Sequence, residues 1–152
     1  MHRSFIAAPA VAVLLALSAG DSAAAQTYVP DQLAQALSPH DANQRGDEAY
    51  DHKNYAEAMR WYRQASAQGY AVAEANIGFL YAKGYGVPQD YAQSVHWYLM
   101  AAEKGQREAQ HNLALKYWNG QGVTKDPTQA RYWMQKAAVN GDPDAQKWLQ
   151  QH

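Results

Sequence analysis

The chain has 152 residues, a formal net charge of −1 and no cysteine. A chain of this length is expected to form one domain, and without disulfides packing alone must hold it together. The balanced charge, with no cluster of Lys and Arg, argues against a nucleic-acid partner, because phosphate binding requires a basic surface.

Residues 1–25 have the features of a cleavable signal peptide. Arg3 provides a positive start, residues 5–19 are apolar and small, and residues 23–25 are alanines that fit a small-x-small cleavage site. The apolar run is too short to span a membrane, so no stable membrane insertion is expected. We predict a mature chain that begins near Gln26 and is periplasmic or secreted. The alternative is an uncleaved anchor.

Residues 26–39 form a leader with a short apolar pattern around Leu33 and Leu37. This pattern predicts a short helix packed on the first repeat, and the alternative is a leader without regular structure. The pair Ser38-Pro39 then indicates a helix start, because serine accepts bonds from free amides and proline is tolerated in the first turn.

The rest of the chain is built from a repeated pattern. Gly69, Gly105 and Gly141 are spaced by 36 residues, and Trp97 and Trp133 precede the second and third of them at equal distances. Self-similarity at a period of roughly 20–50 residues indicates a solenoid of supersecondary units. The predicted units are residues 40–69, 70–105 and 106–141, followed by a C-terminal capping helix at residues 142–152.

Each unit carries the signals of two helices. Asn54, Asp90 and Asp126 stand where a second helix starts, and each is followed three positions later by Glu or Gln, which predicts a capping box. Gly84 and Gly120 stand where a first helix ends and are suited to its left-handed stop. Gly69, Gly105 and Gly141 do the same for the second helices. The predicted fold is all-α, built from helix–turn–helix repeats.

The two longer units share the pattern Ala-x-x-x-Ile/Leu-Gly/Ala-x-x-Tyr-x-x-Gly-x-Gly-Val-x-x-Asp, closing on Trp-x-x-x-Ala-Ala-x-x-Gly. This pattern resembles the Sel1-like repeat of the tetratricopeptide superfamily. The unit 40–69, whose interhelix turn is five residues shorter, looks more like an ordinary tetratricopeptide repeat. The resemblance implies a right-handed α-solenoid whose concave face is lined mainly by the first helix of each unit. It also implies binding of a protein or peptide rather than catalysis.

The first helix of each unit presents a stripe of residues at helical spacing. The stripe is acidic in the first unit, where the charges of Asp47 and Asp51 repel unless a cation or basic ligand meets them. It is apolar in the second unit and aromatic with mixed polar groups in the third. The candidate partner-binding residues on these stripes are Asn43, Asp47, Asn76, Phe79, Lys83, His111, Leu115 and Trp118.

These residues are suited to holding an extended or helical peptide. Phe79 and Trp118 would be its anchors, and Asn76 and Asn112 would bond its backbone. The alternative is that Phe79, Trp118 and Leu115 pack against neighbouring helices, that the charges are solvated, and that the asparagines bond only within the solenoid.

Sites for chemistry are absent from the sequence pattern. None of the six histidines stands at a metal-ligand spacing from another ligand, and Ser66 and Ser94 occupy positions where other units have alanine. No serine lies in a motif with a histidine and a carboxylate. We therefore expect no enzyme, no metal and no cofactor.

The function expected from these features is an exported protein- or peptide-binding adaptor or scaffold in the cell envelope. The alternative is a cell-wall or β-lactam hydrolase like the cysteine-rich relatives, although this chain lacks their cysteines. A secreted effector or immunity-type protein that uses the same groove is a third possibility. The sequence does not indicate an oligomeric state.

Overall fold

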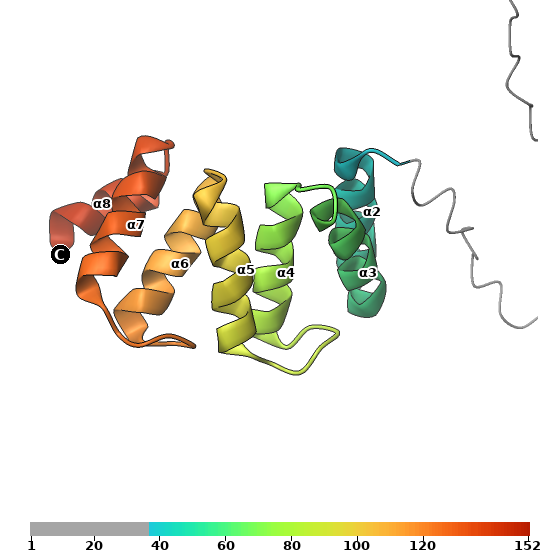
Figure 1. Ribbon diagram of the computed structural model, residues 1–152, viewed down its shortest axis with the longest axis horizontal. Helices are drawn as coiled ribbons and strands as arrows, with labels where there is room; N and C mark the ends of the chain where they lie inside the picture. The colour runs from blue at the N-terminus through green and yellow to red at the C-terminus, as the bar shows by residue number, and fades with distance from the viewer. Residues whose placement is uncertain (1–36) are drawn as a thin grey trace, which may run out of the picture.

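The computed structural model describes residues 37–152, and every regular element in that range is an α-helix. The expected signal peptide at residues 1–25 and the leader up to residue 36 lie outside the described residues. Seven helices of the described range follow one another through short connections (Figure 1). They are α2 (Pro39–Asp51), α3 (Tyr55–Ser66), α4 (Ala71–Lys83), α5 (Tyr91–Glu103), α6 (Arg107–Asn119), α7 (Pro127–Val139) and α8 (Pro143–Gln151).

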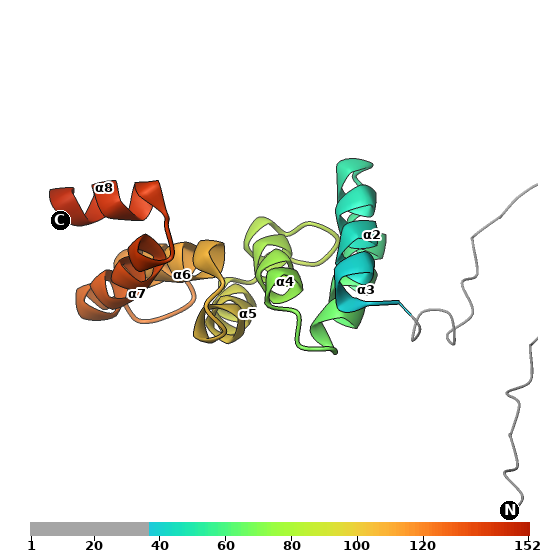
Figure 2. The ribbon, with the colours of Figure 1, turned by 90° about the horizontal axis from the view of Figure 1, so that it is seen from above.

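The helices form antiparallel pairs that stack along one axis. Helix α2 packs on α3, α4 on α5, and α6 on α7, while α3·α4, α5·α6 and α7·α8 join one pair to the next. Figure 2 shows α2, α4, α6 and α8 along one side of the stack and α3, α5 and α7 along the other. The predicted all-α solenoid of helix–turn–helix repeats is confirmed.

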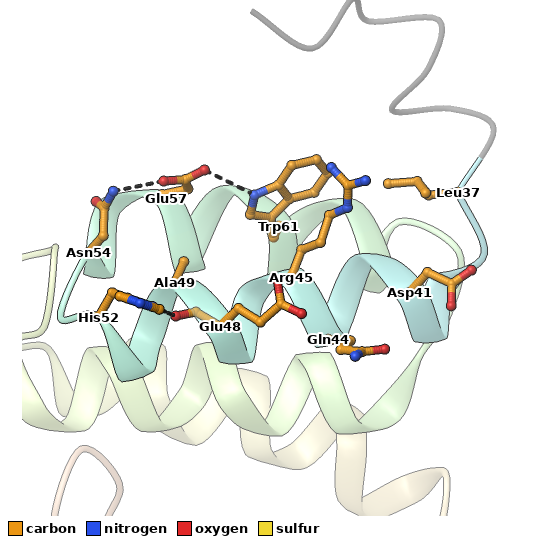
Figure 3. Close-up of a pocket in the computed structure, with 10 residues that line it drawn as sticks. All are labelled: Leu37, Asp41, Gln44, Arg45, Glu48, Ala49, His52, Asn54, Glu57 and Trp61. Carbon is orange, nitrogen blue, oxygen red and sulfur yellow. Dashed lines mark hydrogen bonds between the residues drawn. The ribbon is translucent and has the colours of Figure 1, made fainter. Parts of the chain in front are cut away.

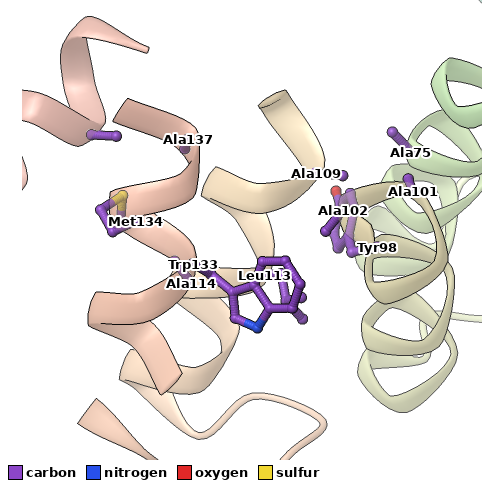
Figure 4. Packing of buried hydrophobic residues seen from close by; sticks show 11 residues of the cluster. Ala75, Tyr98, Ala101, Ala102, Ala109, Leu113, Ala114, Trp133, Met134 and Ala137 are labelled. Atoms are coloured by element: carbon purple, nitrogen blue, oxygen red, sulfur yellow. The ribbon is translucent and has the colours of Figure 1, made fainter. Parts of the chain in front are cut away.

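Small side chains and aromatic rings share the core. Ala73 and Ala101 are fully buried, and the ring of Tyr98 lies so close to Gly78 that a Cβ atom there would be 3.0 Å from it. Figure 4 shows Tyr98 beside the alanines of α5, with Trp133 reaching in from α7. Helix backbones approach closely because these positions lack bulk.

The predicted helix starts are confirmed at three positions. The Ser38 hydroxyl accepts a bond from the amide of Asp41 at 3.1 Å, and Pro39 follows in the first turn of α2. Asp90 and Asp126 each accept two amide bonds from the first turns of α5 and α7, at 2.9 and 3.0 Å.

The predicted capping boxes are wrong in two respects. Asn54 caps no amide, and its side-chain amide group donates to the Glu57 carboxylate at 2.7 Å. The second bond of the capping box, in which the side chain three positions later accepts from the backbone amide of the cap residue, is also absent at Asp90 and Asp126. The backbone amides of Asp90 and Asp126 already donate to the carbonyls of Tyr81 and Tyr117, at 3.0 and 2.9 Å, which leaves no free donor for the glutamines.

The predicted glycine stops are confirmed. Gly84 and Gly120 end α4 and α6 in the left-handed conformation. Gly105 follows α5 with φ +87°, its amide donates to Ala102, and the next amide donates to Ala101. This pair of bonds is a Schellman motif, and it recurs after α3 and α7.

Lys53 occupies the corresponding left-handed position after α2, with φ +60°. A residue with a side chain loses about 1–2 kcal/mol of stability in this conformation, and glycine avoids that cost. Glycine also makes the unfolded chain more flexible, which offsets part of the stability gained. We expect Lys53→Gly to raise the free energy of unfolding by about 0.5–1 kcal/mol in urea titrations. Lys53→Ala keeps the strained backbone and should give no such gain. A destabilised glycine variant would contradict this explanation.

Candidate functional site

A pocket of about 240 Å³ opens between α2 and α4. Three of the predicted partner-binding residues, Asp47, Asn76 and Phe79, line it. The helix pairing brings them together from two different repeats. The remaining lining residues are Tyr50, Tyr62 and Leu80.

A polar network forms one wall of this pocket. Asp47 accepts bonds from the Asn43 amide at 3.0 Å and from the Tyr62 hydroxyl at 2.8 Å. The side-chain amide of Asn76 donates across the repeat boundary to Asn43 at 3.1 Å and to Asp47 at 3.4 Å. Asn43 is only 6% exposed. The amide of Asn76 is thus engaged within the solenoid, which is the alternative that the sequence left open.

The pKa values of two tyrosines in the pocket lining are raised, in part by nearby carboxylates. Burial, the hydrogen bond to Asp47 and the charges of Asp47 and Asp51 raise the pKa of Tyr62 far above its ordinary value. Burial, together with Tyr55, Tyr85 and Asp51, also raises the pKa of Tyr50. Both phenols therefore remain protonated at neutral pH, and negative charge in the pocket belongs to the carboxylates alone.

Phe79 and Tyr50 also line the pocket and belong to a cluster of four aromatic rings. Tyr55 and Tyr85 stack at 4.5 Å between ring centroids, and Tyr50 contacts Tyr55 at 5.4 Å and Phe79 at 6.1 Å. Phe79 is partly exposed, so it both packs on this cluster and faces the pocket. Lys83 lies one helical turn further, with Nζ 5.7 Å from the centre of the Phe79 ring.

Two predicted residues of the third unit contact the C-terminal helix and its caps. The Trp118 ring lies 5.1 Å from Trp148 and 5.0 Å from His152, edge to face in both cases, and His111 Nδ1 lies 2.8 Å from the carboxylate of Asp142. Leu115 packs on the hydrophobic cluster that includes Leu113 and Trp133. None of these three predicted residues lines the pocket between α2 and α4.

Asp142 caps α8 and makes its attachment sensitive to acid. Burial opposes ionisation of this carboxyl, but bonds from the Ala145 and Asp144 amides and from His111 outweigh burial, so the pKa is lower than the ordinary 3.8. A lowered folded-state pKa gives stability that is complete above the unfolded value and is lost as pH falls through the folded value. We expect protection of the Ala145 amide from hydrogen exchange to be steady above about pH 4 and to fall below it.

Asp142→Asn provides the control for this prediction. The amide oxygen still accepts the bonds of α8, but the group no longer titrates, so the loss of protection in acid should disappear. A wild-type profile that also stays flat below pH 4 would show that the carboxylate does not hold α8.

A larger pocket, which the sequence reasoning missed, lies at the outer end of the stack between α2 and α3. Figure 3 shows its lining, and its volume is about 830 Å³. Trp61 is one of the lining residues, with Arg45 and Arg60 5.0 and 5.2 Å from its ring and the Glu57 carboxylate 3.4 Å from its indole nitrogen. The sequence did contain a signal for this pocket. Trp61 occupies the position of the repeated tryptophans, and no repeat was predicted before the first unit to pack against it.

Two absences concern residues 37–152 only. No three His, Cys, Asp or Glu side chains in this range come together in a way that suits a metal ion. None of the helices within the same range is long and apolar enough to cross a membrane.

The Sel1 repeat family model matches residues 41–70, 71–106 and 107–142. The match includes the first unit, which its short turn had placed nearer an ordinary tetratricopeptide repeat. A comparison with curated proteins finds no match.

Solved structures with the same architecture include two relatives of substantial identity. A Sel1 repeat protein from Oxalobacter formigenes is 37% identical with a TM-score of 0.68, over 70% of this chain and 44% of that one. The protective antigen c5321 of uropathogenic Escherichia coli, described as having an SLR fold, is 39% identical with a TM-score of 0.69, over 76% of this chain and 26% of that one. The chain thus spans less than half of either relative.

A third structure is similar in fold alone. The cysteine-rich protein B (hcpB) of Helicobacter pylori is 24% identical with a TM-score of 0.60, over 61% of this chain and 70% of that one. The present chain has no cysteine, so whatever depends on cysteine in that protein has no counterpart here.

Proposed function

Because the chain belongs to the Sel1 repeat family, whose modules generally mediate protein interactions, we propose that it is an exported adaptor that binds a protein or peptide of the cell envelope. The partner lies on the face formed by α2, α4 and α6. The observation that carries this proposal is the pocket between α2 and α4, where charged, amide and aromatic side chains from two repeats line one opening.

The bonds within that pocket favour a rigid binding surface. Asn43, Asp47, Tyr62 and Asn76 hold one another in place before any partner arrives. A surface that is already ordered loses little conformational freedom on binding, so even a small interface retains useful affinity. With three repeats the surface is limited, and a micromolar interaction or a larger assembly fits its size.

Export and the absence of catalysis belong to the same proposal. The charged start, apolar run and alanine cleavage site of residues 1–25 support export. A passive role is supported by the lack of any serine, histidine and carboxylate constellation in the sequence. Turnover of nitrocefin or of labelled muropeptides by the purified protein would instead favour the hydrolase alternative.

Site-specific photocrosslinking in the native envelope tests the binding face. We expect a photoreactive phenylalanine analogue at Phe79 to yield a discrete adduct with another polypeptide. The same analogue at Val139, which is 85% exposed on α7 in the other layer, should yield none. Adducts from Val139 alone, or from neither position, would remove the proposed binding face.

A further inference from the structure

We infer that the pocket between α2 and α4 receives a basic side chain, a lysine or an arginine, of the partner polypeptide. This inference rests on the proposed function and names the chemistry that the pocket selects. It is carried by three features. The Asp47 carboxylate lines the pocket and has no cationic partner in the range 37–152, and Asp51 lies one helical turn along α2. Aromatic side chains share the lining, and the pocket is of suitable size.

The carboxylates of Asp47 and Asp51 lie one helical turn apart on α2, and neither forms an ion pair with any residue in the range 37–152. Both oxygens of Asp47 accept bonds, but only from neutral amide and hydroxyl donors. These bonds fix the carboxylate without cancelling its charge. A cation in the pocket would do so, and would also relieve the repulsion between the two carboxylates.

The aromatic side chains of the lining suit the same ligand. Phe79 and Tyr50 line the pocket together with Asp47, and Tyr55 and Tyr85, which stack on each other, contact Tyr50 and Phe79. A cation over an aromatic face gains about 0.5–1 kcal/mol at an exposed site and more where water is excluded. The pocket volume of about 240 Å³ corresponds to roughly eight water molecules, enough for the aminobutyl end of a lysine or the guanidinium of an arginine.

Lys83 is the charged group that opposes this occupant. Its ammonium lies 5.7 Å from the Phe79 ring, on the turn of α4 beyond the pocket. Like charges repel, so Lys83 weakens the binding of a second cation and would strengthen the binding of an acidic side chain. Removing the charge of Lys83 therefore strengthens the binding of a basic side chain and weakens the binding of an acidic one. A Lys83 variant thus tests directly whether the pocket prefers a positive or a negative side chain.

Titration of the purified protein with amino-acid amides, followed by NMR, tests the inference. The probes are Nα-acetyl-lysine methylamide and its arginine analogue, with the norleucine and glutamate analogues as neutral and acidic controls. We expect the basic probes to shift the side-chain amide signals of Asn76 and Asn43, and the neutral and acidic probes to leave them unchanged. Asp51→Asn should weaken the basic probes about two- to fivefold, and Lys83→Gln should tighten them by a similar factor.

The variants are chosen so that folding does not obscure the result. Asp51 is exposed and makes no hydrogen bond or ion pair in the described range. Lys83 is also exposed and makes neither in that range; it contacts the Phe79 ring, and its charge interacts with that of Lys116. Equal shifts from the norleucine and lysine probes would overturn the inference, as would binding of the glutamate probe that weakens in Lys83→Gln. If the basic probes cause no shift but the crosslinked adduct at Phe79 still forms, the pocket does not bind a basic side chain and the proposed function stands. Loss of the adduct removes the binding face whatever the probes show.

Discussion

Gly122→Ala is expected to destabilise the protein by about 3–5 kcal/mol, enough to leave little folded protein under mild denaturing conditions. Gly122 lies in the turn between α6 and α7 with φ +74°. A Cβ atom there would lie 2.2 Å from the backbone carbon and oxygen of Tyr91, at the start of α5. Backbone atoms in a capped helix start cannot yield as a flexible side chain can. The clash therefore adds to the cost of about 1–2 kcal/mol for the left-handed conformation itself.

Gly105→Ala separates these two costs. Gly105 has a similar conformation, with φ +87°, but no atom lies within 4 Å of the position of its Cβ. We expect its substitution to cost only about 1–2 kcal/mol in the same urea titration. Equal losses for the two variants would show that the turn of the third unit does not rest on the second.

The close contact at Gly122 recurs at the preceding boundary and sets how the repeats stack. A Cβ atom at Gly86 would lie 2.7 Å from the backbone of Tyr55, at the start of α3. Each long turn thus rests on the second helix of the unit before it. These two contacts hold the turn after α4 against α3 and the turn after α6 against α5.

Most of the fold was predictable because its signals are local and repeated. The aspartates at the helix starts and the glycines at the helix ends each act within one turn of chain, and the 36-residue period repeats them. The exception at Asn54 has a structural cause. The first turn is five residues shorter, and its backbone at Asn54 is not extended as it is at Asp90 and Asp126.

The candidate site was less predictable because its contacts cross the repeats. The sequence placed Asp47 and Asn76 on the right helices, but their hydrogen bond depends on how far α4 is shifted along α2. Similarly, Trp118 meets Trp148 and His152 only because α8 folds back on α6. A periodic pattern identifies the face of a helix, and it does not report which other element covers that face.

One contact recurs in all three units with changed chemistry. The side chains of Gln68, Lys104 and Asn140 each donate to the carbonyl of the residue two positions before the first helix of their own unit, at 3.3, 3.4 and 3.3 Å. In the third unit Asn140 also donates to the neutral Gln110 at 2.8 Å. In the second unit the equivalent pair is charged, because Lys104 bonds the carboxylate of Glu74.

The charged version makes Lys104 the more sensitive position. Glu74 is 1% exposed, and within residues 37–152 its second carboxylate oxygen has no hydrogen-bond partner, so Lys104 is the cation paired with this buried carboxylate. Lys104→Met should cost about 2–4 kcal/mol in urea titrations, less than a fully enclosed pair would lose because the lysine side chain is 40% exposed. Asn140→Ala, which breaks the neutral version, should cost only about 1 kcal/mol.

A double variant tests whether the buried charge is the cause. Glu74→Gln with Lys104→Asn copies the pair of the third unit, so both groups remain hydrogen-bonded and no charge is buried. We expect the free energy of unfolding of the double variant to lie within about 1 kcal/mol of the wild type. Lys104 is replaced in this variant too, so the comparison with Lys104→Met isolates the effect of the buried charge. If Lys104→Met costs no more than Asn140→Ala, water reaches Glu74 and the carboxylate does not depend on its lysine. If the double variant is as unstable as Lys104→Met, the lysine acts through packing of its side chain rather than through its charge.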